Sequence, residues 1–160
     1  MVVSDNTQYK SKIMDQLINM PDIVTLINNP DITYSNRGAL KNINIFSRPK
    51  ISGFTSEIKN YICFDFNSRT NPSNKVLKNI SFNLMIICHE NDIDTDYGNR
   101  HDAIDGVIID AFNWSDFLGF ELELVSDVEG ILETEYHTRT LQFRNLTPNS
   151  LSNGVKMDGY

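Results

Sequence analysis

Residues 75–90, KVLKNISFNLMIICHE, constrain the fold more than any other segment of this sequence. Alternate positions in it are apolar, as in a β-strand with one buried face: Ile80, Phe82, Leu84, Ile86 and Cys88. The other face becomes apolar only near its end, at Met85 and Ile87. A strand that is apolar on both faces at one end fits the centre of a sheet that is covered there on both sides. The segment therefore predicts the central strand of a sheet.

Three further segments predict the rest of this sheet. Residues 59–67 place Ile62, Phe64 and Phe66 on one face, and the Asn-, Ser- and Pro-containing segment 67–74 is typical of a hairpin connection. Residues 120–127 and 135–145 also alternate, and we expect a loop around Gly130 to join them as a hairpin. Short connections of this kind imply antiparallel neighbours.

Two helices are expected beside the sheet. Within residues 8–28 the apolar residues recur at helical spacing (Tyr9, Ile13, Met14, Leu17 and Ile18), and Pro21 should end or kink that helix. Residues 99–112 carry a second apolar stripe of Ile104, Val107, Ile108 and Ala111. The pattern predicts an α+β fold: a mainly antiparallel sheet of about four to five strands with two helices packed on one face.

The 160 residues predict a single domain that spans the whole chain, 1–160. Three parts of it lack a clear pattern. We expect a flexible N-terminus over 1–7, a long loop over 29–55 and a polar C-terminal tail over 145–160. Within the long loop, Leu40, Ile43 and Ile45 of ALKNINIF could form a short strand.

The composition excludes several classes of protein. A net charge of −7 without any run of Lys or Arg argues against a general nucleic-acid binder. The N-terminus does not resemble a signal peptide, and the longest apolar run, 84–88, is far too short to span a membrane, so we expect a cytosolic protein without a membrane partner. Cys63 and Cys88 lack a CxxC spacing and are expected to be buried free thiols.

The densest group of potential ligands is CHENDIDTDYGNRHD, residues 88–102. A metal-dependent hydrolase that uses His89, His101 and Asp102 is one interpretation. Against it, such enzymes take their ligands from several helices, whereas His89 ends a predicted strand. Adjacent helical residues such as His101 and Asp102 also point about 100° apart.

A calcium loop counted from Asp92 fails at its two critical positions, which are Tyr97 and Ala103 instead of Gly and Glu. No nucleophile elbow, phosphate-binding loop or dinucleotide fingerprint is present. We therefore expect no catalytic residue, no metal and no cofactor. The acidic run is interpreted as a solvated loop that leads into the positive N-terminus of a helix.

The order of these segments is similar to that in a known protein family. A two-sided strand ends in His89, a polar loop follows, then YGNRHDAIDGVIIDAFN (97–113), and the last strand is YHTRTLQFRNLTPN (136–149). This arrangement resembles the tail terminator proteins (tail completion or tail-to-head joining proteins) of tailed bacteriophages. The likeness covers residues 57–149, while 29–55 has no counterpart in it.

The resemblance implies a structural virion protein and not an enzyme. Members of that family form a ring, expected here to be a homo-hexamer, that caps the tail tube and joins the tail to the head connector or stopper protein. DNA would pass through the lumen without specific binding. The expected location is the tail–head junction of the virion, with assembly in the host cytoplasm. The alternatives are another head–tail connector or adaptor of the neck, and the metal-dependent hydrolase.

The resemblance also suggests residues for contacts between subunits. The candidates are charged side chains on the polar face of the long helix, in the segment after it and on the last strand: Arg100, Asp102, Asp105, Glu121, Glu123, Arg139 and Arg144. We expect Arg100 and Arg139 to pair with acids across subunits, for example Glu121 or Glu123. The alternative is solvated surface charge of little energetic weight. Trp114 and Phe117 are expected in the core.

Overall fold

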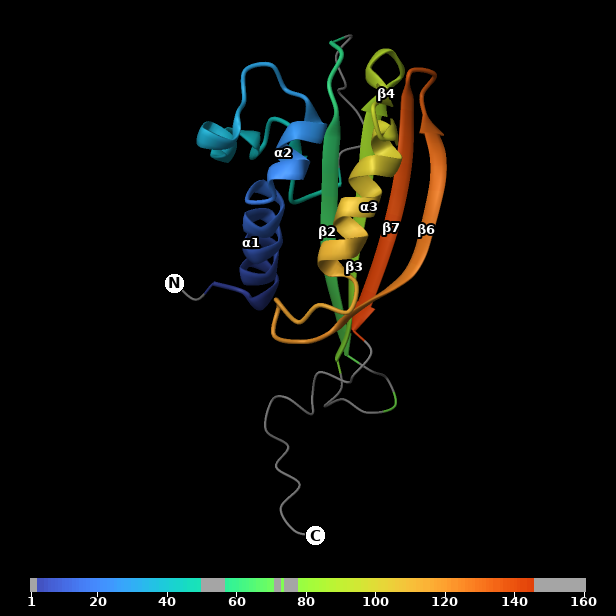
Figure 1. The fold of residues 1–160 in the computed structure, drawn as a ribbon. Coiled ribbons are helices and arrows are strands. Elements are labelled where there is room, and N and C mark those ends of the chain that lie inside the picture. Colours follow the sequence, from blue (N-terminus) through green and yellow to red (C-terminus); the bar gives the residue numbers. More distant parts are fainter. Residues whose placement is uncertain (1–2, 50–56, 71–72, 74–77, 146–160) are drawn as a thin grey trace.

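A five-stranded sheet organises the chain in the computed structural model, which describes residues 3–49, 57–70, 73 and 78–145 (Figure 1). The strand order is β1-β2-β3-β7-β6, in which only the β1–β2 pair is parallel. The strands are β1 (Ile45–Phe46), β2 (Tyr61–Thr70), β3 (Lys78–His89), β6 (Leu122–Leu132) and β7 (Tyr136–Asn145). The predicted α+β fold with a mainly antiparallel sheet is confirmed, and β3 is its central strand.

Three α-helices cover one face of the sheet: α1 (Asp5–Ile18), α2 (Pro21–Ile27) and α3 (Arg100–Phe112) (Figure 1). Pro21 separates the first two and occupies the first position of α2, where its missing N–H costs nothing. Helix α1 starts at Asp5 because the Ser4 hydroxyl accepts a hydrogen bond from the Thr7 N–H. The prediction of a flexible segment over 1–7 is therefore wrong from Asp5 onwards.

The expected long loop over 29–55 is partly regular. It contains the 3₁₀ helix η1 (Tyr34–Leu40) and strand β1, while residues 50–56 lie outside the described residues. Of the possible strand through Leu40, Ile43 and Ile45, only Ile45 lies in a strand, while Leu40 ends η1. Of the predicted C-terminal tail, only Asn145, the last residue of β7, is described.

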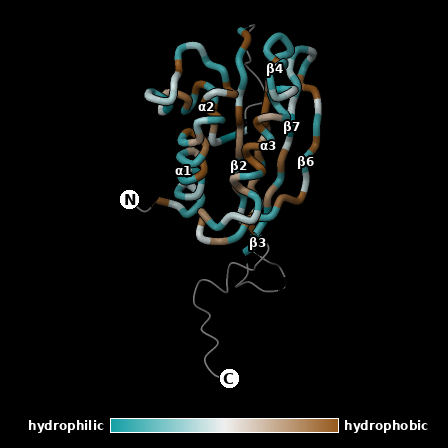
Figure 2. The backbone as a smooth tube through the Cα atoms, viewed as in Figure 1, coloured by the Kyte–Doolittle hydropathy of each residue, from teal (hydrophilic) through white to brown (hydrophobic). Residues whose placement is uncertain are grey.

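The core lies between the sheet and the helices. Phe82 of β3 stands at its centre, with ring centroids 5.9, 5.7 and 5.6 Å from those of Phe64, Phe112 and Phe143. Figure 2 shows the alternation of hydrophobic and hydrophilic residues along the strands and helices that produces this core. A smaller cluster on the other face of the sheet consists of Phe46, Tyr61, Cys63, Ile87 and Tyr136. Both cysteines are buried free thiols, as predicted.

The β6–β7 hairpin differs from the prediction in its turn. Strand β6 continues through Gly130 to Leu132, and the chain turns at 133–135. A β-bulge between Leu124 and Ser126 shifts the alternation of β6 by one residue. Asp127 and Glu129 pair with Leu141 and Arg139 in register, so they lie on the face that the helices cover. The bulge therefore decides which acids of β6 face α3.

The acidic run between β3 and α3 is more structured than expected. It forms the 3₁₀ turn η2 (Glu90–Asp92) and a small hairpin of β4 (Asp94–Thr95) and β5 (Gly98–Asn99).

After α3, Phe117 packs against Phe112, as predicted. Trp114 is 58% exposed, so its expected place in the core is wrong. Among the described helices, none is long and apolar enough to cross a membrane.

Candidate functional site

Arg100 is a buried residue that joins the first turn of α3 to the rest of the fold. Its Nη2 lies 3.0 Å from Asp92 Oδ1, while its Nε and Nη1 donate to the carbonyls of Asp92 and Leu26 at 2.6 and 2.8 Å. A buried guanidinium needs these partners because it is costly to desolvate. The predicted place of Arg100 on an exposed polar face is wrong, since only 7% of the residue is exposed.

Asn60 is a second polar residue that links these elements. Its side chain donates to Ile27 O at 3.0 Å and to Asp92 Oδ2 at 2.7 Å, and its Oδ1 accepts from the His89 N–H at 3.2 Å. It connects the end of α2, the η2 loop and the end of β3. The expectation of a fully solvated acidic loop is wrong for Asp92, whereas Asp94 and Asp96 are exposed as predicted.

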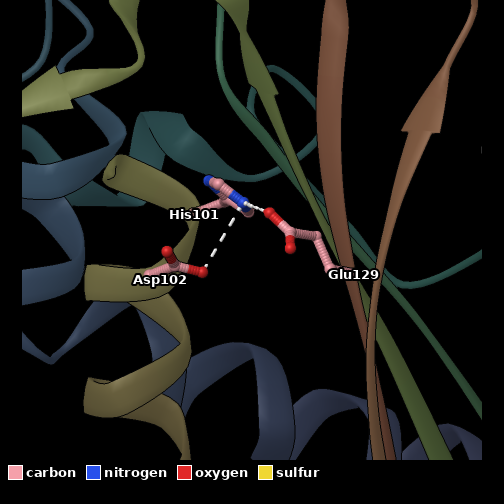
Figure 3. A group of neighbouring side chains, drawn as sticks. All are labelled: His101, Asp102 and Glu129. Atoms are coloured by element: carbon pink, nitrogen blue, oxygen red, sulfur yellow. Dashed lines mark hydrogen bonds and ion pairs between the residues drawn. The ribbon is translucent and has the colours of Figure 1, made fainter. Parts of the chain in front are cut away.

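A second polar group lies between α3 and the β6–β7 hairpin. We call it the His101 cluster; its members are His101, Asp102, Asp105, Asp127, Glu129 and Arg139. His101 is only 1% exposed, and its Nε2 lies 2.9 Å from Glu129 Oε1 and 3.5 Å from Asp102 Oδ1 (Figure 3). These three side chains come from two elements, with the imidazole of α3 directed toward the carboxylate of β6.

Arg139 of β7 holds the carboxylates of this cluster together. Its Nη1 lies 3.0 Å from Asp102 Oδ1, and its Nε lies 2.9 Å from Asp127 Oδ1 and 3.4 Å from Asp105 Oδ2. Three acids of its own chain thus surround Arg139, and its expected pairing with acids of a neighbouring subunit stays a prediction. Asp105, expected on the polar face of α3, is only 8% exposed.

The protonation of two acids in the cluster is shifted by their surroundings. Burial, and then the negative charge of Asp127, raise the pKa of Asp105 to about 6, against the opposing effect of Arg139. The hydrogen bond from His101 lowers the pKa of Glu129. Asp105 therefore keeps its proton to a higher pH than an ordinary Asp, whereas Glu129 loses its proton at a lower pH than an ordinary Glu.

The other two histidines have different partners, although His137 lies beside the cluster. The His137 ring is 5.7 Å from that of His101, and its Nε2 contacts Glu90 Oε2. His89 ends β3, as predicted, and its Nδ1 accepts from the Asn91 N–H at 3.0 Å. The ligand set His89, His101 and Asp102 of the hydrolase interpretation is not brought together. Among the described residues, the side chains with the spacing of metal ligands around His101 and Asp102 include Glu129 and not His89.

The remaining interface candidates lie at the other end of the hairpin. Arg144 Nε lies 3.0 Å from Glu123 Oε2 within the same chain, and Arg144 is largely exposed. Glu121 is exposed just before β6. Whether any of these residues contacts a neighbouring subunit stays a prediction.

Asp127 and Glu129 are the site residues that sequence reasoning missed. Glu129 was missed because we expected the strand to end at Asp127, before a loop at Gly130. Asp127 was missed because an alternating sequence pattern does not reveal the bulge at Val125, which reverses the face of the residues after it. Although neighbours in a helix point about 100° apart, His101 Nε2 lies 3.5 Å from Asp102 Oδ1, so the two side chains of the first turn of α3 do come together. The only available sequence signal was the acidic alternation of residues 121–129.

The outer surface has an exposed edge strand and a groove between two helices. Strand β6 forms one edge of the sheet and, among the described strands, pairs with β7 alone. Its Val128 and Ile131 are 60% and 71% exposed. Between α2 and α3 lies a groove of about 550 Å³, lined on its apolar part by Leu26, Ala103 and Val107.

The fold and site together define a small α+β protein with a charged cluster beneath an exposed edge strand. The chain belongs to the YomW family, whose model matches residues 12–145. This match covers every described helix and strand except the first turns of α1. No curated protein and no solved structure matches the chain.

Proposed function

We propose that this protein is a structural subunit of the phage neck, a tail terminator. It would form a ring that caps the tail tube and joins the tail to the head connector. The order of elements supports this proposal, because β3 ends at His89, a loop leads to α3, and the β6–β7 hairpin closes the sheet. These are the features on which the sequence resemblance rests.

The exposed edge strand β6 is the observation that carries the proposal. It is 11 residues long, and one side of its backbone has no strand partner among the described residues. Val125, Val128 and Ile131 add exposed apolar surface along it. An edge of this length invites pairing with another chain unless the native assembly covers it. A neighbouring subunit is the partner that such an edge fits.

Ring closure also needs a second, different surface on the same subunit. A contact between unlike surfaces repeats around an axis, and it closes into a ring when the rotation is right. The groove between α2 and α3 offers apolar surface at Leu26, Ala103 and Val107. We infer that the β6 edge of one subunit contacts a surface of this kind on the next, with six subunits in the ring.

The remaining partners follow from the same proposal. The net charge of −7 suits a lumen through which DNA passes without specific binding. The tail tube protein and the head connector or stopper would contact opposite sides of the ring in the virion, after assembly in the host cytoplasm. The proposal requires no catalysis from this chain.

Native mass spectrometry of the full chain, alone and with purified tail tubes, tests this function. We expect a hexamer in solution or on the tube ends. The variant Val128→Asp should abolish the hexamer because it buries a charge at the subunit contact. Ser11→Asp adds the same charge on the exposed face of α1 and serves as the matched control.

Two outcomes would contradict the proposal. One is a chain that stays monomeric at high concentration and does not bind tail tubes. The other is a ring that binds isolated heads and not tails, which would favour the alternative of a head-side connector or adaptor. Circular dichroism must show that Val128→Asp keeps its fold, and Val128→Thr provides a milder version of the same test.

A further inference from the structure

The His101 cluster contains more acids than its cations can balance. Four carboxyl groups, those of Asp102, Asp105, Asp127 and Glu129, surround one guanidinium and one imidazole. Even with His101 protonated, the ionised cluster keeps an excess of two negative charges. Asp102 and Glu129 are exposed, but Asp105 and Asp127 are not, and excess charge of one sign around less exposed carboxylates is costly unless a counter-charge is bound. A divalent cation would supply this counter-charge.

Three side chains of the cluster already have the spacing of metal ligands. His101 Nε2 lies 2.9 Å from Glu129 Oε1 and 3.5 Å from Asp102 Oδ1, and the three ligand atoms are all within 4.8 Å of one another. Ligand atoms at about 2.0–2.1 Å from a tetrahedral zinc ion lie roughly 3.3 Å apart. The two observed distances lie close to this spacing, and both carboxylates are exposed and can rotate to adjust it.

The surroundings of these ligands are those of an organised site. Arg139 Nη1 lies 3.0 Å from Asp102 Oδ1 and fixes the orientation of this carboxylate, as outer partners of metal ligands do. Asp105, one turn further along α3, is 8% exposed, and its Oδ1 has no hydrogen-bond partner among the described residues. His101 Nε2 is the ring nitrogen that faces the two carboxylates, while Nδ1 has no partner in the described part of the chain.

We propose that His101, Asp102 and Glu129 bind one divalent transition-metal ion, with zinc as the best-suited member of the class. An imidazole nitrogen with two carboxylate oxygens suits Zn²⁺, whereas Mg²⁺ and Ca²⁺ favour sites made of oxygen alone. Water or the neighbouring His137 imidazole can complete the coordination. The ion links α3 to the edge strand β6. The site goes beyond the proposed ring, although Glu129 lies on the edge strand and Asp102 lines the groove that the ring proposal uses.

Isothermal titration calorimetry and native mass spectrometry of the full chain with ZnCl₂ test the proposal. We expect one Zn²⁺ per chain, a rise in the melting temperature on its addition, and much weaker binding of MgCl₂. Glu129→Gln and Asp102→Asn should each lower the affinity for Zn²⁺ by at least about tenfold. Glu123→Gln, on the same strand and outside the cluster, should bind Zn²⁺ like the wild type.

Glu129→Gln is the decisive variant because Glu129 is exposed and its replacement preserves size and leaves the core intact. Wild-type affinity in this variant would overturn the proposal, and so would the absence of stoichiometric Zn²⁺ on the unmodified chain. Formation of the ring is tested separately, by measuring the oligomeric state of the metal-free chain in EDTA. Loss of Zn²⁺ binding would contradict the metal site, whereas a monomer in EDTA that does not bind tail tubes would contradict the proposed function.

Discussion

At the scale of single residues, Asp105 is a carboxyl group whose charge depends strongly on the fold. Asp127, Asp102 and Arg139 face it, and burial followed by Asp127 raises its pKa to about 6. The folded protein therefore holds this proton more tightly than the unfolded chain does. The stabilisation from that proton is complete below about pH 4 and is lost as the pH rises through about 6.

Replacement of Asp105 by Asn keeps the shape and removes this titration. In EDTA at pH 8, we expect Asp105→Asn to raise the free energy of unfolding by on the order of 1 kcal/mol, with the difference disappearing near pH 4. Urea unfolding from pH 4 to 8 measures it. Asp110→Asn, on the exposed side of the same helix, is the control. A variant less stable than the wild type at pH 8 would show that the Asp105 charge is net stabilising.

At the scale of secondary-structure elements, Asn60 and Arg100 determine how the ends of several elements meet. Asn60 is 1% exposed and joins the end of α2, the η2 loop and the end of β3 by three hydrogen bonds. Because Ala cannot satisfy the groups left behind, Asn60→Ala should lower the free energy of unfolding by about 3 kcal/mol. Thermal and urea unfolding measure the loss.

Asn67 gives the matched control for this prediction. It lies on the same strand, β2, but is exposed and hydrogen-bonds only to Asp65 among the described residues. Asn67→Ala should change the free energy of unfolding by less than about 0.5 kcal/mol. Equal losses in the two variants would contradict the role of Asn60 as the joint between elements.

At the scale of the whole molecule, the ring of Phe82 connects the central strand to β2, β7 and α3. It is fully buried, so Phe82→Ala should lower the free energy of unfolding by about 3–5 kcal/mol through the lost contacts and the cavity. Met85→Ala, on the other face of the same strand, should cost clearly less because Met85 is only partly buried. Urea unfolding of both variants compares the two faces, and a larger loss in Met85→Ala would contradict this assignment of the core.

The sequence by itself determined the elements and the layers. Alternation in residues 78–89 required a central strand, the spacing of Ile104 and Ile108 required a helix with a buried stripe, and Pro21 required a break between α1 and α2. These signals are local, because the period of two or 3.6 residues follows from the backbone geometry of each segment. The class of fold could therefore be predicted without any long-range information.

Only the tertiary structure decided which polar residues meet. One extra residue in β6, at the bulge beside Val125, turned Asp127 and Glu129 toward α3. Arg100 pairs with Asp92, and Arg139 pairs with Asp102 and Asp127, all within the same chain. The sequence pattern did not predict these pairs. A bulge and the crossing of a helix over a hairpin are set by packing between distant segments, which leaves no periodic trace in the sequence. For this reason the fold was predictable, while the His101 cluster had to be found in three dimensions.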